Sequence, residues 1–209
     1  NDQAINTAGS HLNIVQVYDP ATDTWDLATD YPKDVMYLGS ATVGDQIVVA
    51  GGFNYNYSPS RYIPDTYIGS VTDGTLSWSK ALDYPIGSII YPCGVGVGDK
   101  AYFTGGRPST DGNAPATGWS FMFDPTTRDW TMIEKKPTPI QDAKLGTDGN
   151  VLIAAGGEPA DLTATNVTEI FDPTADPFAG VGVDKNPIIP TISKPATAAT
   201  AVALAIKNR

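Results

Sequence analysis

Short apolar runs, each bounded by Gly, Pro or Asp, follow one another along this chain. The stretch from Trp119 to Gly157 holds four of them: an apolar run that ends in Asp-Pro (119–125), a run around Trp130, a run before a Gly-containing turn (142–149) and an apolar run that ends in Gly-Gly. Runs of about four to eight residues between turn residues are typical of β-strands. The pattern predicts an all-β fold.

This group of four runs repeats with a period of about 50 residues. Trp25, Trp78 and Trp130 recur in register with Gly-Gly pairs at 51–52, 105–106 and 156–157. An aromatic-Asp-Pro element recurs as VYDPATDTW (17–25), MFDPTTRDW (122–130) and IFDPTADPF (170–178), with Phe178 in place of the tryptophan. Pro and a capping Asp or Thr set the turn in this element, so we expect a hairpin whose Trp packs between neighbouring sheets.

These features resemble the kelch repeat, in which an apolar strand ends in Gly-Gly and an aromatic-Asp-Pro element precedes a Trp. The resemblance covers residues 3–178 and implies a kelch-type β-propeller whose blades are four-stranded antiparallel sheets. The chain departs from the kelch pattern between the Trp and the Gly-Gly pair, where it reads PKDVMY, PIGSII and PTPIQD without the usual Arg. Kelch propellers usually have six or seven blades, and 209 residues are too few for that number.

The strands predicted by the repeat make about four blades. Residues 3–10 resemble strand two of a blade, and the C-terminal run 197–206 resembles strand one, although its Ala content also permits a short helix. We expect residues 1–185 to form the propeller and residues 186–209, rich in Pro, Ala and Thr, to complete a composite blade in the same or a neighbouring chain. Three arrangements remain open: a closed four-bladed propeller, a fragment of a larger propeller, and a polymer built by strand donation.

Charge and composition exclude some classes of partner. The formal charge is −10 with only 13 Lys and Arg, so the chain lacks the electrostatic attraction that phosphate backbones need, and we expect no nucleic acid partner. No run reaches the roughly 18 apolar residues of a membrane span. Sequons at Asn56 and Asn166 in turn-rich stretches predict glycosylation and an extracellular, secreted protein that opens without a signal peptide, as a trimmed product would.

Kelch propellers include copper radical oxidases of the galactose oxidase type, whose cofactor needs a Cys cross-linked to a Tyr, a second Tyr and two His ligands. Cys93 resembles the family's cross-linking Cys in its place before a strand-one run, but residues 141–143 of the following unit offer no Tyr. His11 is the only histidine, and two imidazole ligands cannot come from one. We therefore interpret Cys93 as a small buried residue and His11 as a surface residue, and we predict no cofactor and no metal site.

The candidate binding residues lie in the long loops that connect strands two and three (53–66, 107–118 and 158–166). In an antiparallel blade these loops emerge on the same face as the loops from strand four to the next blade, which carry Tyr31, Tyr84 and Tyr91. Tyr and Asn with an interspersed Arg suit protein contact or carbohydrate stacking, unless the rings only pack the loops down. The candidates are Phe53, Tyr55, Tyr57, Arg61 and Tyr62.

We therefore predict a non-enzymatic extracellular module, structural or binding, that contacts a protein or glycan through its loops as a subunit of a larger assembly. Self-association through the C-terminal segment is a further expectation. The alternative is a fragment of a kelch-propeller enzyme, such as a copper radical carbohydrate oxidase, whose ligand residues lie outside these 209 positions.

Overall fold

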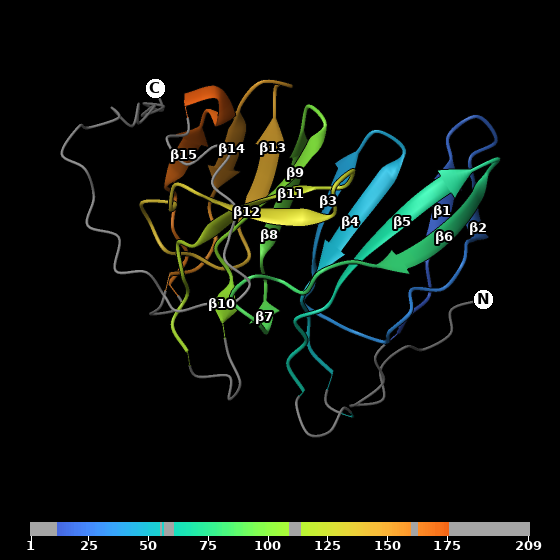
Figure 1. Cartoon of the computed structure of the whole chain (residues 1–209), viewed down its shortest axis with the longest axis horizontal. Coiled ribbons are helices and arrows are strands. Elements are labelled where there is room, and N and C mark those ends of the chain that lie inside the picture. The colour runs from blue at the N-terminus through green and yellow to red at the C-terminus, as the bar shows by residue number, and fades with distance from the viewer. Residues whose placement is uncertain (1–11, 55, 57–60, 109–113, 160–162, 176–209) are drawn as a thin grey trace.

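The computed structural model describes residues 12–54, 56, 61–108, 114–159 and 163–175. Four antiparallel sheets, which we call the first to fourth blades, stand side by side along an arc (Figure 1). The first blade pairs β1 (Gln16–Asp19) with β2 (Thr24–Leu27), and the second has the order β3 (Gly39–Val43), β4 (Gln46–Ala50), β5 (Thr66–Thr72), β6 (Thr75–Lys80). The third contains β8 (Cys93–Val97), β9 (Lys100–Thr104), β11 (Ser120–Asp124) and β12 (Asp129–Ile133), and the fourth contains β13 (Lys144–Thr147), β14 (Leu152–Ala155) and β15 (Thr168–Phe171).

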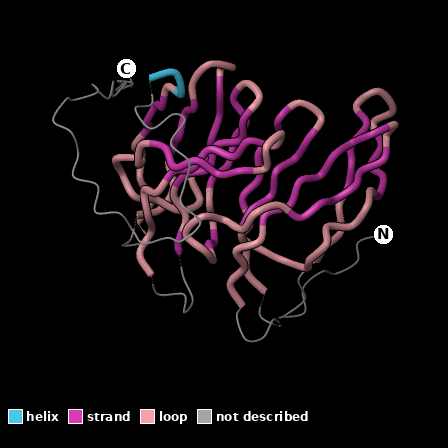
Figure 2. Tube along the Cα trace, in the orientation of Figure 1, coloured by secondary structure: helices cyan, strands magenta, loops and turns pink. Residues whose placement is uncertain are grey.

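The all-β prediction is confirmed, with two complete four-stranded blades among the described residues. A short pair that the repeat pattern did not predict, β7 (Ile89–Ile90) with β10 (Arg107–Pro108), lies beneath the third blade in Figure 1. The 3-10 turn η1 (Pro173–Ala175) is the one helical element in the described part of the chain (Figure 2). The sheets formed by the described residues do not close into a ring. The composite blade stays a prediction because residues 3–10 and 197–206 lie outside the described residues.

The predicted hairpin turns form as expected. The carboxylates of Asp19, Asp124 and Asp172 each accept a backbone N–H two residues further on, from Ala21, Thr126 and Thr174, at 2.8 Å in all three cases. Such Asx turns offer the backbone a local partner and stop the strand. The aromatic-Asp-Pro element is therefore a strand followed by a side-chain-capped turn.

Glycines allow the blades to approach one another closely along the inner strands. The first strands β3, β8 and β13 of successive blades lie against each other. A Cβ added at Gly94 or Gly96 of β8 would lie 2.3 Å from the Ser40 carbonyl oxygen or 1.8 Å from that of Thr42. Only glycine fits at such a backbone approach. Residues 94–97 of the GVGVG run therefore lie in an inner strand.

A repeated aromatic contact joins the blades further out. Trp78 donates its indole N–H to the Thr29 carbonyl at 3.1 Å, and Trp130 donates to the Leu82 carbonyl at 3.1 Å. Tyr31 lies edge-on to Trp78 at 5.0 Å and Tyr84 edge-on to Trp130 at 5.1 Å. Each Trp therefore packs on the preceding blade, as predicted.

We expected the rings of Tyr31 and Tyr84 on the loop face. The contact with Trp78 and Trp130 places them elsewhere. They are only 7% and 2% exposed, because each ring is enclosed between two blades. Their role is in the junction between blades.

Asp65 is held by two lysines at the junction of the first and second blades. Its carboxylate lies 2.5 Å from Lys33 and 2.5 Å from Lys80. Burial would raise the pKa of Asp65, but hydrogen bonds and charge from the two lysines outweigh burial and hold this pKa below its usual value. The ionised carboxylate therefore stabilises the fold above the usual pKa of Asp.

We expect this contribution to be lost as the pH falls from about 4 through the lowered pKa of Asp65. The variant Asp65→Asn should be less stable than the parent near neutral pH and should lose part of this acid sensitivity, as measured by urea unfolding across the pH range. Asp83→Asn is the control, because Asp83 is an exposed second partner of Lys80 at 3.2 Å. Identical pH profiles for the parent and Asp65→Asn would contradict the assignment.

Candidate binding face

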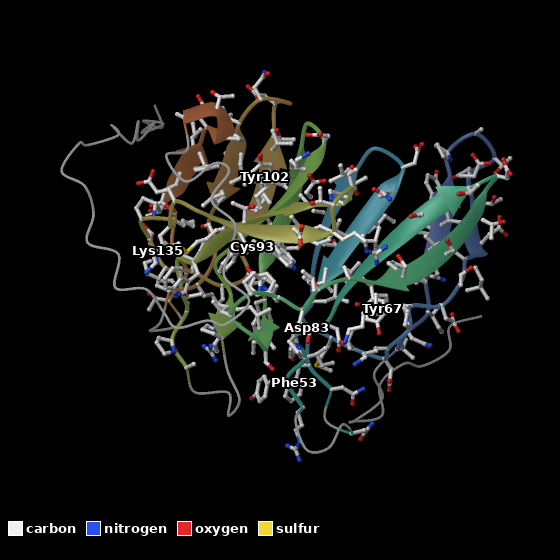
Figure 3. All side chains as sticks on the ribbon, viewed as in Figure 1. Phe53, Tyr67, Asp83, Cys93, Tyr102 and Lys135 are labelled. Atoms are coloured by element: carbon white, nitrogen blue, oxygen red, sulfur yellow. The ribbon has the colours of Figure 1, made fainter. Side chains whose placement is uncertain are left out.

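The loops that leave strands two and four gather at one end of the blades, where Figure 3 places Phe53. Three equivalent residues at this end, Tyr37, Tyr91 and Asp142, precede the first strands of successive blades. Their φ angles are 62°, 56° and 52°, in the left-handed region that non-glycine residues seldom adopt. Backbone strain of this kind persists only where the surroundings enforce it, and it clusters at functional sites.

Backbone hydrogen bonds link these three positions from blade to blade. The Tyr91 N–H donates to the Tyr37 carbonyl at 2.8 Å, and the Asp142 N–H donates to the Tyr91 carbonyl at 3.5 Å. The left-handed residues therefore form a connected row across the inner edge of this end. We call this end, with the row and the loops around it, the binding face.

The binding face carries a strip of aromatic rings over the second and third blades. The rings of Tyr37 and Tyr91 lie 4.4 Å apart, that of Phe53 lies 6.3 Å from Tyr37, and that of Tyr62 lies 5.0 Å from Phe53. Tyr37 is 43% exposed. Burial and then a hydrogen bond with Tyr37 raise the pKa of Tyr91 to about 12, so the Tyr91 hydroxyl stays protonated at neutral pH. The strip offers flat apolar rings with neutral polar tips, the combination enriched at protein interfaces.

The residue that follows each Gly-Gly pair differs from blade to blade, so the chemistry of the face differs too. These positions hold Phe53, Arg107 and Glu158, which pair through their backbones with Met36, Ile90 and Gln141. The Gln141 side-chain amide donates to the Glu158 carboxylate at 3.1 Å. The face is therefore aromatic over the second blade, gains a guanidinium over the third, and ends in the carboxylates of Asp142 and Glu158 over the fourth.

The predicted binding residues lie on this face as far as the structure describes them. Phe53 is 7% exposed and supports the strip, Tyr62 is half-buried, and Arg61 is exposed. Tyr55 and Tyr57 lie outside the described residues. A binding role for these five residues stays a prediction.

Four other residues of the face, namely Tyr37, Arg107, Asp142 and Glu158, were not predicted from the sequence. Tyr91 was expected on the face but was not among the candidate binding residues. The signal was present, since each lies at a fixed offset from strand one or from the Gly-Gly pair in every unit.

Cys93 lies beneath the face, packed against Ile140 and Ala143. It is buried, as interpreted from the sequence, and burial raises the pKa of its thiol to about 11. Among the described residues, no group of three or more His, Cys, Asp and Glu side chains is placed to hold a metal ion. His11 lies outside them. In the same part of the chain, no helix is long and apolar enough to cross a membrane.

A pocket of about 340 Å³ lies between the third and fourth blades. Five of its lining residues hold the same repeat positions as residues that surround Trp130 in the third blade. The equivalent pairs are Glu134 and Leu82, Lys136 and Tyr84, Ala154 and Phe103, Glu169 and Phe121, and Phe171 and Phe123. The equivalent of Trp130 is Phe178, which lies outside the described residues. The pocket thus matches a junction position in the repeat, and we do not assign it to a ligand.

An ion pair replaces the aromatic pair at this third junction. Tyr31 packs on Tyr67 at 5.4 Å, and Tyr84 packs on Phe121 at 5.3 Å. At the equivalent positions Lys136 forms a salt bridge with Glu169, whose carboxylate also accepts the Thr138 hydroxyl at 2.6 Å. The side chain of Lys136 is only 5% exposed, so the ion pair with Glu169 offsets the cost of burying its charge.

Two complete four-stranded antiparallel blades, inner strands in contact, and Trp residues and Gly-Gly pairs that recur about every 50 residues define a kelch-repeat β-propeller. Comparisons with known proteins agree with this class. The chain is 29% identical over 160 residues to the Kelch-like protein terF of Aspergillus terreus, a match that covers 72% of this chain and 33% of that protein. It is 32% identical over 123 residues to Kelch-like protein 35 of Mus musculus, covering 57% of this chain and 18% of the relative.

Among solved structures, the chain superposes on YjhT, a kelch-type propeller, with a TM-score of 0.64 at 14% sequence identity. The superposition covers 76% of this chain and 49% of that one. No family model matches the chain. The chain therefore spans a third or less of the curated relatives that it matches and about half of the structural neighbour.

Proposed function

We propose that this chain is a non-enzymatic binding module that holds a protein partner on the binding face. The observation that carries the proposal is the row of three equivalent left-handed residues, which presents Tyr37 and Tyr91 side by side at the edge of long loops. A rigid scaffold that positions strained, partly exposed aromatic residues on loops is a frequent arrangement for recognition.

A protein partner is favoured over a glycan by the kelch-like character of the relatives and by the mixed chemistry of the face. A partner with an apolar or aromatic anchor would pack on the strip, and its charges would meet Arg107 on one side and Asp142 with Glu158 on the other. Charge arranged in this way selects the orientation of a partner more than it adds affinity.

Photo-crosslinking tests the proposal. A photoreactive phenylalanine analogue placed at Tyr37 should give a protein adduct in material from the source organism, identified by mass spectrometry. The matched control places the analogue at Val71, which is 46% exposed at the opposite end of β5 and should give no adduct. Adducts from Val71 alone, or from both positions equally, would contradict the proposed face.

The identified protein then supports a binding measurement. Tyr37→Asn removes the ring but keeps a side chain that tolerates the left-handed backbone, so it should weaken binding at least about tenfold without unfolding the blade. A glycan array tests the other class of partner. Glycan binding that is lost in Tyr55→Ala or Tyr57→Ala, with no protein adduct, would replace the protein partner by a carbohydrate.

We also propose that the protein is extracellular and glycosylated. The support is that Asn56 and Asn166 are both exposed, the first in the loop beside the binding face and the second just before β15. Native protein should lose mass on enzymatic deglycosylation, and Asn56→Gln with Asn166→Gln should remove that change. Native protein that carries no glycan would remove this support.

A further inference from the structure

Tyr37 and Tyr91 form a closely packed pair of phenol rings at the inner edge of the second and third blades. The ring centroids lie 4.4 Å apart, and the ring planes are inclined to one another by 34°. Aromatic pairs in proteins usually have centroids about 4.5–7 Å apart, so this pair is at the short end of the range. Tyr37 is 43% exposed and Tyr91 is half-buried, so small molecules in solution can reach the pair.

The repeat makes the two rings run in the same direction. Tyr37 and Tyr91 hold equivalent positions before β3 and β8, and both have left-handed backbone conformations, with φ angles of 62° and 56°. Their backbones are joined by the 2.8 Å hydrogen bond from the Tyr91 N–H to the Tyr37 carbonyl. A further hydrogen bond joins the two side chains and contributes to the raised pKa of Tyr91. The hydroxyls therefore lie together, and so do the ortho ring carbons beside them.

A second tyrosine pair in the described part of the chain has a different geometry. The ring centroids of Tyr31 and Tyr67 lie 5.4 Å apart, and the ring planes meet at 74°. An edge-to-face pair presents the hydrogens of one ring to the face of the other, so its ortho carbons are not aligned. Tyr31 is also only 7% exposed, which shields this pair from solution. Tyr31 and Tyr67 therefore provide an internal control for any chemistry that depends on the arrangement of Tyr37 and Tyr91.

We propose that Tyr37 and Tyr91 are a site of oxidative cross-linking, where one-electron oxidation driven by a peroxide joins the two rings as dityrosine. Each phenol loses one electron and its hydroxyl proton and becomes a tyrosyl radical. The two radicals combine by forming a carbon–carbon bond between their ortho carbons. Each of these carbons then releases its hydrogen as a proton while the oxygen of the same ring takes up a proton, which restores both phenols. The pair loses two electrons and two protons in all, which reduce one hydrogen peroxide to two waters.

The contact between the rings makes this coupling an intramolecular step. Two groups held in reacting geometry behave as if at very high concentration, whereas phenols on separate chains must first meet by diffusion. The new bond ties the residue before β3 to the residue before β8, so it joins the second blade covalently to the third. A cross-link of this kind restricts the unfolded chain more than the folded one and therefore stabilises the fold. The reaction needs only the ring geometry and an oxidant, and no partner on the binding face.

Treatment of the folded chain with a peroxidase and hydrogen peroxide tests this site. We expect a monomeric product that has lost two hydrogen atoms by intact mass and that shows the fluorescence of dityrosine. Trypsin separates the two tyrosines into peptides 34–61 and 81–100, so tandem mass spectrometry should find these peptides joined at Tyr37 and Tyr91. The yield of this product should not change on dilution, because both phenols belong to one chain.

Three variants show whether the paired rings cause the reaction. Tyr37→Phe and Tyr91→Phe keep the rings but remove the hydroxyls, so each should lower the yield of cross-linked monomer at least about tenfold. Tyr67→Phe is the matched control, the same change in the edge-to-face pair, and it should leave the yield unchanged. An undiminished yield in Tyr37→Phe, a cross-linked monomer joined mainly at other tyrosines, or products formed only between chains would overturn the proposal. Folded parent protein that forms no dityrosine would overturn it as well.

Discussion

Replacing Trp130 with alanine is expected to lower the free energy of unfolding by about 3–5 kcal/mol. The indole is 5% exposed and lies among the rings of Tyr84, Phe103 and Phe123. Alanine would leave a cavity that the flanking blades cannot fill, and it would leave the Leu82 carbonyl without the 3.1 Å hydrogen bond from the indole. Urea unfolding followed by circular dichroism measures the change.

Two further variants show whether the cavity causes this loss. Trp130→Phe keeps an aromatic ring but not the indole N–H, so it should lose about half as much stability as alanine. Val71→Ala removes exposed side-chain atoms and should stay within about 0.5 kcal/mol of the parent. A loss below about 1 kcal/mol in Trp130→Ala would show that the junction between the second and third blades does not hold the fold together.

Removing one partner of the Lys136–Glu169 ion pair is expected to lower the free energy of unfolding by nearly as much. Lys136→Met should lower the free energy of unfolding by about 3 kcal/mol. This loss is at the lower end for a buried ion pair, because Glu169 keeps 19% of its side chain exposed. The cause is the carboxylate, which would remain in a largely apolar pocket without its cation. Urea unfolding again measures the change.

The double variant Lys136→Tyr with Glu169→Phe restores the aromatic pair that the second junction already uses, Tyr84 on Phe121. We expect it to be as stable as the parent or more stable by up to about 2 kcal/mol, because replacing a buried ion pair by packed apolar groups is often neutral or favourable. A double variant as unstable as Lys136→Met would show that the three junctions are not equivalent.

The repeating parts of the fold could be predicted because they depend on local chemistry. Asp-Pro turns, apolar strands and Gly-Gly pairs act within a few residues of one another, so their spacing predicted the strands and placed Trp130 between blades. The β7–β10 pair was missed because its two-residue strands are too short to show a period.

The binding face was only partly predicted because its residues are defined by backbone conformation and by neighbouring blades. The composition of the 53–66 loop identified Phe53 and Tyr62 as aromatic residues near the face. It could not show that Phe53 is buried under its neighbours, or that Tyr37 and Tyr91 adopt the left-handed region that brings their rings to 4.4 Å. Tyr31 and Tyr84 were expected at the loop face for the same reason, since nothing in their own loops indicates that the following Trp encloses them.

Hydrogen exchange of the indole N–H groups, read from the nitrogen–proton NMR spectrum of dilute monomeric protein, tests most directly whether the junctions repeat. The account predicts slow exchange for Trp78 and Trp130, which donate to the Thr29 and Leu82 carbonyls, and fast exchange for Trp25, which is 66% exposed. Equal exchange at all three positions, or protection of Trp25 alone, would contradict a repeated junction in which Trp78 and Trp130 are enclosed and Trp25 is exposed.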